Sequence, residues 1–260
     1  MAQTEQEALP LNSGSDQHGE IGRLMAIAAR LENMPPQDIT AWALQEFEKS
    51  ITIATGFGAE GLVLIDMACR AFSNPDVFFL DTGFLFPETY ELRRRIEDRY
   101  GIEIREISPG LTPQSQERAY GPGLWARDPD LCCRLRKLEP LKDALSGFDA
   151  WMTAIRRDQT AARANAQAVE WDYRWGLVKV SPLVRWSSRE VWDYISREKI
   201  PYNPLHDQGY PSIGCTHCTR PVRAGEDDRA GRWSGHVKTE CGLHGRPVNA
   251  TEPVTLKKAG

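Results

Sequence analysis

The hydrophobic and polar positions of this chain predict strands and helices in alternation. Apolar runs at 51–55, 77–81, 102–108 and 150–155 have the length and the β-branched or aromatic content of buried strands, and 179–184 is a weaker fifth. Two helices precede the first strand, and helical spacing of apolar residues returns at 62–72, 87–101 and 187–199. Such alternation favours right-handed crossovers. We therefore predict an α/β fold, a parallel sheet with flanking helices.

Several of the predicted helices carry recognisable end signals. The second helix opens at the double proline of 35–36, and the helix over 87–101 is stopped by Gly101. The helix over 187–199 has the capping-box pair Ser187 and Glu190 and ends before Pro201. A further helix begins near Cys132, in the stretch CCRLRKLEPL.

Composition divides the chain into three regions. With 260 residues, of which 41% are hydrophobic, the chain can bury one α/β core with appendages. The polar residues 1–20 predict a disordered N-terminal tail, and residues 21–200 hold the α/β domain with the cysteine-bearing helix. Residues 201–260 are rich in Gly, Pro and charge and predict a loop-rich C-terminal segment whose last ten residues are also disordered.

Charge and hydropathy exclude some partners. A net charge of -4 argues against binding to nucleic acid or to a membrane surface. No apolar run approaches the length of a membrane span, and we predict a cytoplasmic protein. In that compartment six cysteines indicate metal binding or catalysis more than disulfides. The oligomeric state, including a homo-oligomer, is left open.

The first strand is followed by a glycine-rich turn, GFGAEG. Gly56, Gly58 and Gly61 satisfy G-x-G-x-x-G, and Asp81 lies twenty residues after Gly61, so an NAD-dependent oxidoreductase is one alternative. A simple tight turn is another. No G-K-[ST] follows, so this is not a Walker loop. Backbone N–H groups at a helix start bind anions, and the turn predicts a site for a nucleotide phosphate in a nucleotide-binding domain.

The second strand ends in LDTGFLFPETY, which places polar groups at the ligand-binding edge of the sheet. Asp81 could accept hydrogen bonds from ribose hydroxyls, and Thr82 could donate to a phosphate. The same residues also fit an ordinary helix start, with Pro87 in the first turn and Glu88 favoured by the helix dipole.

Four of the six cysteines form two pairs. Cys132 and Cys133 are adjacent, and Cys215 and Cys218 form a C-x-x-C. Adjacent side chains diverge, which is awkward for one tetrahedral ion but suits a cubane, where each cysteine can bind a separate iron. We therefore predict a [4Fe-4S] cluster, with structural zinc and unligated or redox thiols as alternatives. Cys69 lies among apolar residues and is predicted to be inert packing.

The last cysteine has a different setting. Cys241 lies in KTECGLHG, with Lys238 close by and with Arg229 and Arg232 upstream. A thiol in such electropositive surroundings should have a depressed pKa and act as a nucleophile. A fortuitous free thiol is the alternative. If the other cysteines are ligands or buried, an adduct on Cys241 must be resolved by a thiol from another molecule.

Taken together and in order, these motifs resemble one family. GFGAEG, LDTGFLFPETY, CCRLRKLEPL, WMTAIRRDQT, IPYNPLHDQGYPSIGCTHC and KTECGLH are similar to the bacterial assimilatory adenylyl-sulfate (APS) reductases, the iron–sulfur branch of the PAPS/APS reductases. The resemblance implies an adenine nucleotide α-hydrolase-like fold and a [4Fe-4S] cluster. It also implies an oxidoreductase of sulfate assimilation and cysteine biosynthesis that uses thioredoxin, or a glutaredoxin-like dithiol donor, to convert adenosine 5'-phosphosulfate into sulfite and AMP.

The resemblance also assigns roles to residues. The four paired cysteines would ligate the cluster, and Cys241 would carry an S-sulfocysteine intermediate. A helix starting at the cysteine pair would place Lys137 one turn after Cys133, between the cluster and the substrate anion. Phe57 stands where a serine is often found, which leaves Thr55 and backbone N–H groups as phosphate donors. The predicted substrate-binding residues are Thr55, Gly56, Gly58, Asp81, Thr82, Gly83, Lys137, Arg163, Arg229, Arg232 and His244.

Rival functions explain less of the sequence. A reductase of the 3'-phosphorylated substrate PAPS, or one with dual specificity, is nearest, but relatives specific for PAPS generally lack the four cluster cysteines. An ATP pyrophosphatase would require a hydroxyl-rich phosphate-binding loop and would not need Cys241. A zinc-stabilised RNA-modifying protein is disfavoured by the acidic net charge. The hypothesis of an NAD-dependent oxidoreductase leaves the cysteines unexplained.

Overall fold

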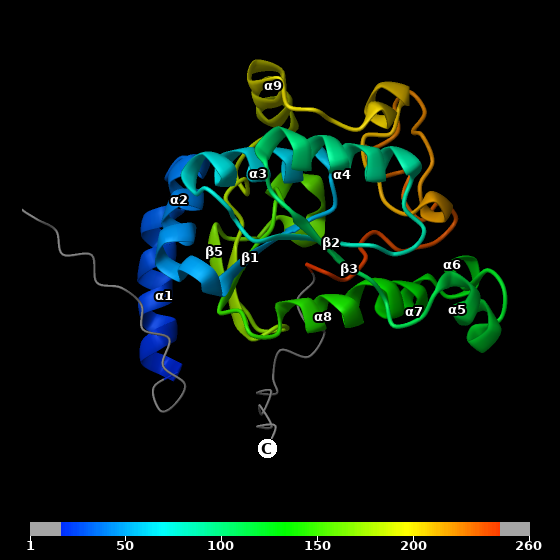
Figure 1. The fold of residues 1–260 in the computed structure, drawn as a ribbon, viewed down its shortest axis with the longest axis horizontal. Helices are drawn as coiled ribbons and strands as arrows, with labels where there is room; N and C mark the ends of the chain where they lie inside the picture. The colour runs from blue at the N-terminus through cyan, green and yellow to red at the C-terminus, as the bar shows by residue number, and fades with distance from the viewer. Residues whose placement is uncertain (1–16, 245–260) are drawn as a thin grey trace, which may run out of the picture.

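The computed structural model describes residues 17–244, which form a sheet with helices on both faces (Figure 1). The strands are β1 (Ile51–Thr55), β2 (Val77–Leu80), β3 (Ile104–Ile107), β4 (Ala150–Met152), β5 (Val169–Asp172) and β6 (Leu177–Val180). The longer helices are α1 (Gln17–Leu31), α2 (Pro36–Phe47), α3 (Ala59–Ala71), α4 (Pro87–Tyr100) and α9 (Ser188–Glu198). The shorter ones are α5 (Pro113–Tyr120), α6 (Leu124–Arg127), α7 (Pro129–Cys133) and α8 (Glu139–Leu145).

The described strands lie in the order β3-β2-β1-β4-β6-β5. Every neighbouring pair is parallel except β5 and β6, which confirms the predicted α/β fold with a mainly parallel sheet. The edge strand β5 was not predicted, because Val169 is its one buried residue. Strand β6 lies at 177–180 rather than 179–184, because the chain turns after Val180, just before Pro182.

The helix-end signals act as predicted. Helix α2 begins at Pro36, and Gly101 ends α4 in the left-handed region at φ 64°. In α9 the Ser187 hydroxyl accepts from the Glu190 N–H at 3.3 Å, and the Glu190 carboxylate accepts from the Ser187 N–H at 2.7 Å. These local interactions fix where each helix starts and stops, and so where the connecting loops lie.

The ends of the chain need one correction. Of the tail predicted for residues 1–20, residues 1–16 lie outside the described residues. Residues 17–20 belong to α1 instead. The predicted disorder of the last ten residues lies outside the described residues, whereas 201–244 consist of turns and short 3-10 segments. Across residues 17–244, no helix is long and apolar enough to cross a membrane.

Helices lie on both faces of the sheet. In Figure 1, α2, α3 and α4 cover one face and α8 lies against the other. The C-terminal segment, orange to red in Figure 1, runs back between these layers beside the sheet. Its course brings the last described residues to the carboxyl ends of the central strands, where ligands of open α/β sheets bind.

The cysteine-bearing helix differs from the predicted one. It begins at Pro129 with Asp128 as N-cap, whose carboxylate accepts from the Leu131 N–H at 2.9 Å. After Cys133 the chain forms a π-helical turn, Arg134–Leu138, before α8 continues. Lys137 therefore lies in a widened turn rather than one α-helical turn after Cys133. Such turns recur at functional sites.

Candidate active site

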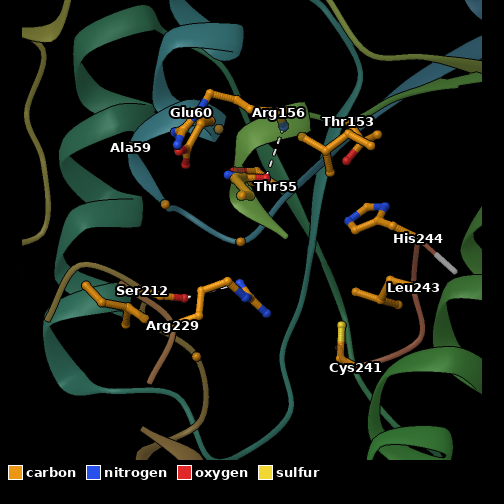
Figure 2. Close-up of a pocket in the computed structure, with 18 of the residues that line it drawn as sticks. Thr55, Ala59, Glu60, Thr153, Arg156, Ser212, Arg229, Cys241, Leu243 and His244 are labelled. Carbon is orange, nitrogen blue, oxygen red and sulfur yellow. Dashed lines mark hydrogen bonds and ion pairs between the residues drawn. The ribbon is translucent and has the colours of Figure 1, made fainter. Parts of the chain in front are cut away.

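A cavity of about 540 Å³ opens at the carboxyl ends of β1, β2 and β4 (Figure 2). Its walls come from the loops after these strands and from the C-terminal segment, so residues far apart in the sequence meet there. Figure 2 shows Cys241, Leu243 and His244 on one wall, with Thr55 and Glu60 across the cavity. The predicted site residues that line it are Thr55, Gly56, Gly58, Thr82, Lys137, Arg163, Arg229, Arg232, Cys241 and His244.

The glycine-rich turn has a tightly packed geometry. The Thr55 hydroxyl accepts from the Phe57 N–H at 3.1 Å, and the buried Phe57 packs against Phe79 with a centroid distance of 5.4 Å. A Cβ atom at Gly61 would lie 2.7 Å from Thr55 Oγ1, so any larger residue there would force the Thr55 side chain or the start of α3 to shift. Because the Phe57 N–H is engaged, the N–H groups left to test the predicted anion site are those at the start of α3.

Two predicted residues do not reach the cavity. Asp81, for which a ribose contact was predicted, and Gly83 are absent from its described lining. The Asp81 carboxylate instead accepts from the Gly83 N–H at 2.8 Å and from the Tyr90 hydroxyl at 2.6 Å, which shapes the turn after β2. The neighbouring Thr82 does line the cavity, but its hydroxyl lies 3.3 Å from the Cys215 sulfur.

The four paired cysteines surround a second, smaller cavity beside the first. The C-x-x-C turn is joined to the loop after β2 by the hydrogen bond from the Thr216 N–H to the Phe84 carbonyl, at 2.8 Å. All six cysteines of the chain lie within residues 17–244, and each is a free thiol. Burial is the main cause that raises the pKa of Cys132 and of Cys218 to about 11.

The surroundings of these thiols fit an anionic metal–thiolate group. Arg136 is 2% exposed, yet its Nε and Nη2 atoms lack a hydrogen-bond acceptor among the described residues, as does the indole N–H of Trp233. Both side chains line the cysteine cavity. Unpaired buried donors are rare, and a bound negative group would satisfy them. Across residues 17–244, no three Cys, His, Asp or Glu side chains are grouped to hold a metal ion directly.

Lys137 connects the two cavities. It lines both of them, with the cysteine pairs on one side and Cys241 on the other. Burial lowers the pKa of Lys137, but the nearby sulfurs of Cys215, Cys241 and Cys133 more than offset that effect and hold the pKa above its ordinary value. The ammonium group therefore stays charged between two places that suit anions.

The C-terminal segment is attached to the domain by polar contacts on both sides of Cys241. Lys238 forms an ion pair with Asp130 in α7. Beyond the thiol, the Arg174 guanidinium donates to the Gly242 carbonyl. These contacts hold the half-buried Cys241 at the cavity wall.

The end of the described segment packs into the cavity. Leu243 joins the smaller apolar cluster on this side of the sheet, and His244 stacks on Trp151 with a centroid distance of 5.7 Å and an interplanar angle of 11°. Burial lowers the pKa of His244 well below its ordinary value, so the imidazole is neutral. Its Nδ1 has no partner among the described residues and can bind a ligand.

The predicted cations divide into two groups. Arg232 donates to the Ser212 hydroxyl at 3.1 Å and lies 4.6 Å over the Trp233 ring. Arg163 is instead paired with Glu240, to which Arg229 also lies close. Burial lowers the pKa of Arg229. A carboxylate that the sequence analysis did not single out, Glu240, therefore lies beside two of the predicted cations.

A second ion pair in the cavity was also missed. Glu60, in the glycine-rich turn, pairs with Arg156, which is 6% exposed and follows β4. Arg156 also binds Asp158 at 2.9 Å. The signal was present, because polar residues directly after a central strand lie at the ligand-binding edge.

Cys69 stands apart from this chemistry. It packs against the main core, and burial, together with the nearby Asp66 carboxylate, raises its pKa to about 12. A thiol of that kind is protonated at neutral pH and is a poor nucleophile. This setting agrees with the predicted inert role.

Comparison with known proteins places the chain among sulfonucleotide reductases. Residues 50–221 match the phosphoadenosine phosphosulfate reductase domain. Adenosine 5'-phosphosulfate reductase of Halalkalibacterium halodurans is 50% identical over 82% of this chain and 93% of its own length. Adenosine 5'-phosphosulfate reductase 2 of Bacillus subtilis is 48% identical over 80% of this chain and 88% of its own length. Phosphoadenosine 5'-phosphosulfate reductase of Gloeobacter violaceus is 43% identical over 84% of this chain and 92% of its own length.

Solved structures agree on the fold. A phosphate complex of phosphoadenylyl-sulfate reductase from Candida auris superposes with a TM-score of 0.67 at 31% identity, covering 80% of this chain and all of that one. FMN adenylyltransferase of Candida glabrata, at 16% identity and a TM-score of 0.54 over 82% of this chain and 68% of its own, shares the fold.

Proposed function

Because this chain belongs to the phosphoadenosine phosphosulfate reductase family, we propose that it reduces adenosine 5'-phosphosulfate (APS) to sulfite and AMP. The observation that carries this proposal is the meeting of Cys241 and Lys137 in a cation-lined cavity at the sheet edge. A thiol beside fixed positive charges is suited to attack an anionic sulfonyl group.

In the first proposed step the Cys241 thiolate attacks the sulfur atom of APS. A new S–S bond forms, the bond from sulfur to the bridging phosphate oxygen breaks, and AMP leaves with the electron pair. Lys137, Arg229 and Arg232 stabilise the charge on the phosphosulfate oxygens. The product on the protein is S-sulfocysteine, and this sulfonyl transfer needs no reductant.

In the second proposed step a thiolate of thioredoxin attacks the Cys241 sulfur. Sulfite leaves, a mixed disulfide forms, and the second thioredoxin thiol displaces Cys241 and regenerates its thiol. The two electrons come from the dithiol, which ends as a disulfide. Cys69 cannot replace the external thiol, since it is packed against the core. A reducing cytoplasm is the compartment that supplies such a donor.

We propose that Cys132, Cys133, Cys215 and Cys218 bind a [4Fe-4S] cluster. The shared cavity and the unpaired donors of Arg136 support it. A bound cluster would bring net negative charge beside Lys137 and would tie α7 to the C-x-x-C turn. No step above transfers an electron to these four residues.

The metal content provides a first prediction. Protein purified without oxygen is expected to be brown and to contain iron and acid-labile sulfide in equal amounts, about four of each per chain. Elemental analysis and a sulfide assay check this. Replacing Cys132 with serine should lower both contents together. Stoichiometric zinc in a colourless, active protein would contradict the cluster.

The substrate assay tests the proposed function itself. We expect thioredoxin-dependent sulfite release from APS at a rate at least about tenfold above that from PAPS, because two relatives that are 50% and 48% identical to this chain carry the APS name. Both substrates are assayed in parallel with the same reduced thioredoxin. Faster release from PAPS would reassign the substrate, and release from neither would refute the proposal.

A further inference from the structure

Glu240, which precedes the nucleophile Cys241, is bound by cations of the cavity. Its carboxylate accepts from Arg163 Nε at 2.9 Å and from Arg163 Nη2 at 2.8 Å. The Thr160 hydroxyl donates to the same carboxylate at 2.9 Å, and Arg229 Nη2 lies 3.6 Å away. The side chains of Arg163 and Glu240 are 9% and 15% exposed, so water screens this pair little.

The contact is of the strong, two-point kind. Two parallel N–H···O bonds between a guanidinium and a carboxylate fix orientation as well as distance. Burial raises the pKa of Glu240, but the hydrogen bonds from Arg163 outweigh this and leave the pKa below its ordinary value, so the group is charged at neutral pH. To an arginine, this carboxylate resembles an oxyanion of a phosphate or sulfate.

Arg163 already uses three of its five N–H groups on protein partners. Its remaining nitrogen, Nη1, donates to the Gln159 side-chain oxygen at 2.5 Å. The cavity still measures about 540 Å³ with the C-terminal segment in place. A substrate anion that enters must therefore share the Arg163 guanidinium with the charged Glu240 carboxylate, which opposes its binding.

We propose that Glu240 is a positioning residue for Cys241, which it holds at the cavity wall by occupying on Arg163 and Arg229 the place of a substrate oxyanion. This inference rests on the proposed function, since it takes that oxyanion to belong to the substrate. The pairing has two consequences of opposite sign. It places the nucleophile, and it lowers the affinity for a substrate anion that binds to the same guanidinium groups.

The substitution Glu240→Gln separates these consequences, because it keeps the size of the side chain and removes its charge. We expect the variant to bind AMP about tenfold more tightly than the wild type, measured by titration calorimetry. At saturating APS without thioredoxin, S-sulfonation of Cys241 should be about tenfold slower in single-turnover mass spectrometry. A residue needed only for folding would weaken binding and slow the reaction together.

Glu226→Gln is the matched control. Glu226 also forms a two-point pair with an arginine in the same loop-rich segment, but its partner Arg220 does not line the cavity, whereas Arg163 does. This variant is expected to match the wild type in both measurements. Glu240→Asp retains the charge and should restore part of the S-sulfonation rate.

A third measurement needs no substrate. In ligand-free protein, iodoacetamide should alkylate Cys241 about tenfold faster in Glu240→Gln than in the wild type or in Glu226→Gln, as followed by the mass of its peptide. If wild-type protein binds AMP and is sulfonated by APS, but Glu240→Gln leaves AMP affinity and alkylation unchanged, the inference is refuted and the proposed function stands. If the wild type does neither, the proposed function fails.

Discussion

Replacing Cys241 with serine is expected to abolish sulfonate transfer and to lower turnover by on the order of 10⁴-fold or more. A serine hydroxyl supplies almost no anion at neutral pH, whereas the cavity provides the thiol with nearby positive charge from Lys137. Wild-type protein incubated with APS alone should release about one AMP per chain and gain the mass of one SO₃ group. The serine variant should do neither, yet it should keep its colour and its affinity for AMP.

Cys69→Ser is the control for this experiment. Cys69 packs against the core, away from the cavity, so this variant should release AMP and gain mass as the wild type does. Reduced thioredoxin should then release sulfite from the wild-type adduct and restore the free thiol. Turnover by Cys241→Ser, or an adduct on the Cys69 peptide, would show that the nucleophile has been misassigned.

The second large effect is expected from Lys137→Met. Methionine fills much of the same space but removes the ammonium group that lies between the two cavities. We expect S-sulfonation at saturating APS to slow by about 10²-fold, which is the usual cost of removing one fixed positive donor from a developing anion. AMP binding should weaken as well, and the iron and sulfide contents should not change.

Lys142→Met provides the matched control. Lys142 is exposed on α8, one helical segment away from Lys137, and lines neither cavity. Its loss should leave the rate, AMP affinity and iron content as they are. A normal rate in Lys137→Met would mean that Lys137 serves only as packing, whereas loss of iron from this variant would make it part of the cluster's support instead.

The sheet could be predicted because its central strands are buried on both faces. The run at 51–55 is almost fully buried between two helix layers, so every residue of the strand is apolar or β-branched. Strand β5 lies at the edge and buries Val169 alone, so its sequence carries little of that signal. Helix ends were predictable because their signals are local. Gly101 ends α4 through its backbone conformation, and Ser187 starts α9 through a hydrogen bond to a nearby residue.

The site was harder to predict because its contacts join distant segments. The pairing of Arg163 with Glu240 spans 77 positions of sequence, and nothing local to either residue indicates the other. Asp81 shows the opposite difficulty, since its position suggested a ligand contact while its carboxylate serves the adjoining turn. The cysteine spacings told more about the site. A metal site shared by both thiol pairs requires that the two regions of the chain lie close together.

The π-helical turn at Arg134–Leu138 changes the phase of the helix that contains it. Each residue of an α-helix advances the direction of the side chains by about 100°, so one residue more per turn rotates everything that follows by about that amount. The apolar residues Leu141 and Leu145 of α8 can thus face the sheet, while Cys132 and Cys133 in α7 face the C-x-x-C turn. One continuous helical rod can in this way serve two partners that lie in different directions from its axis.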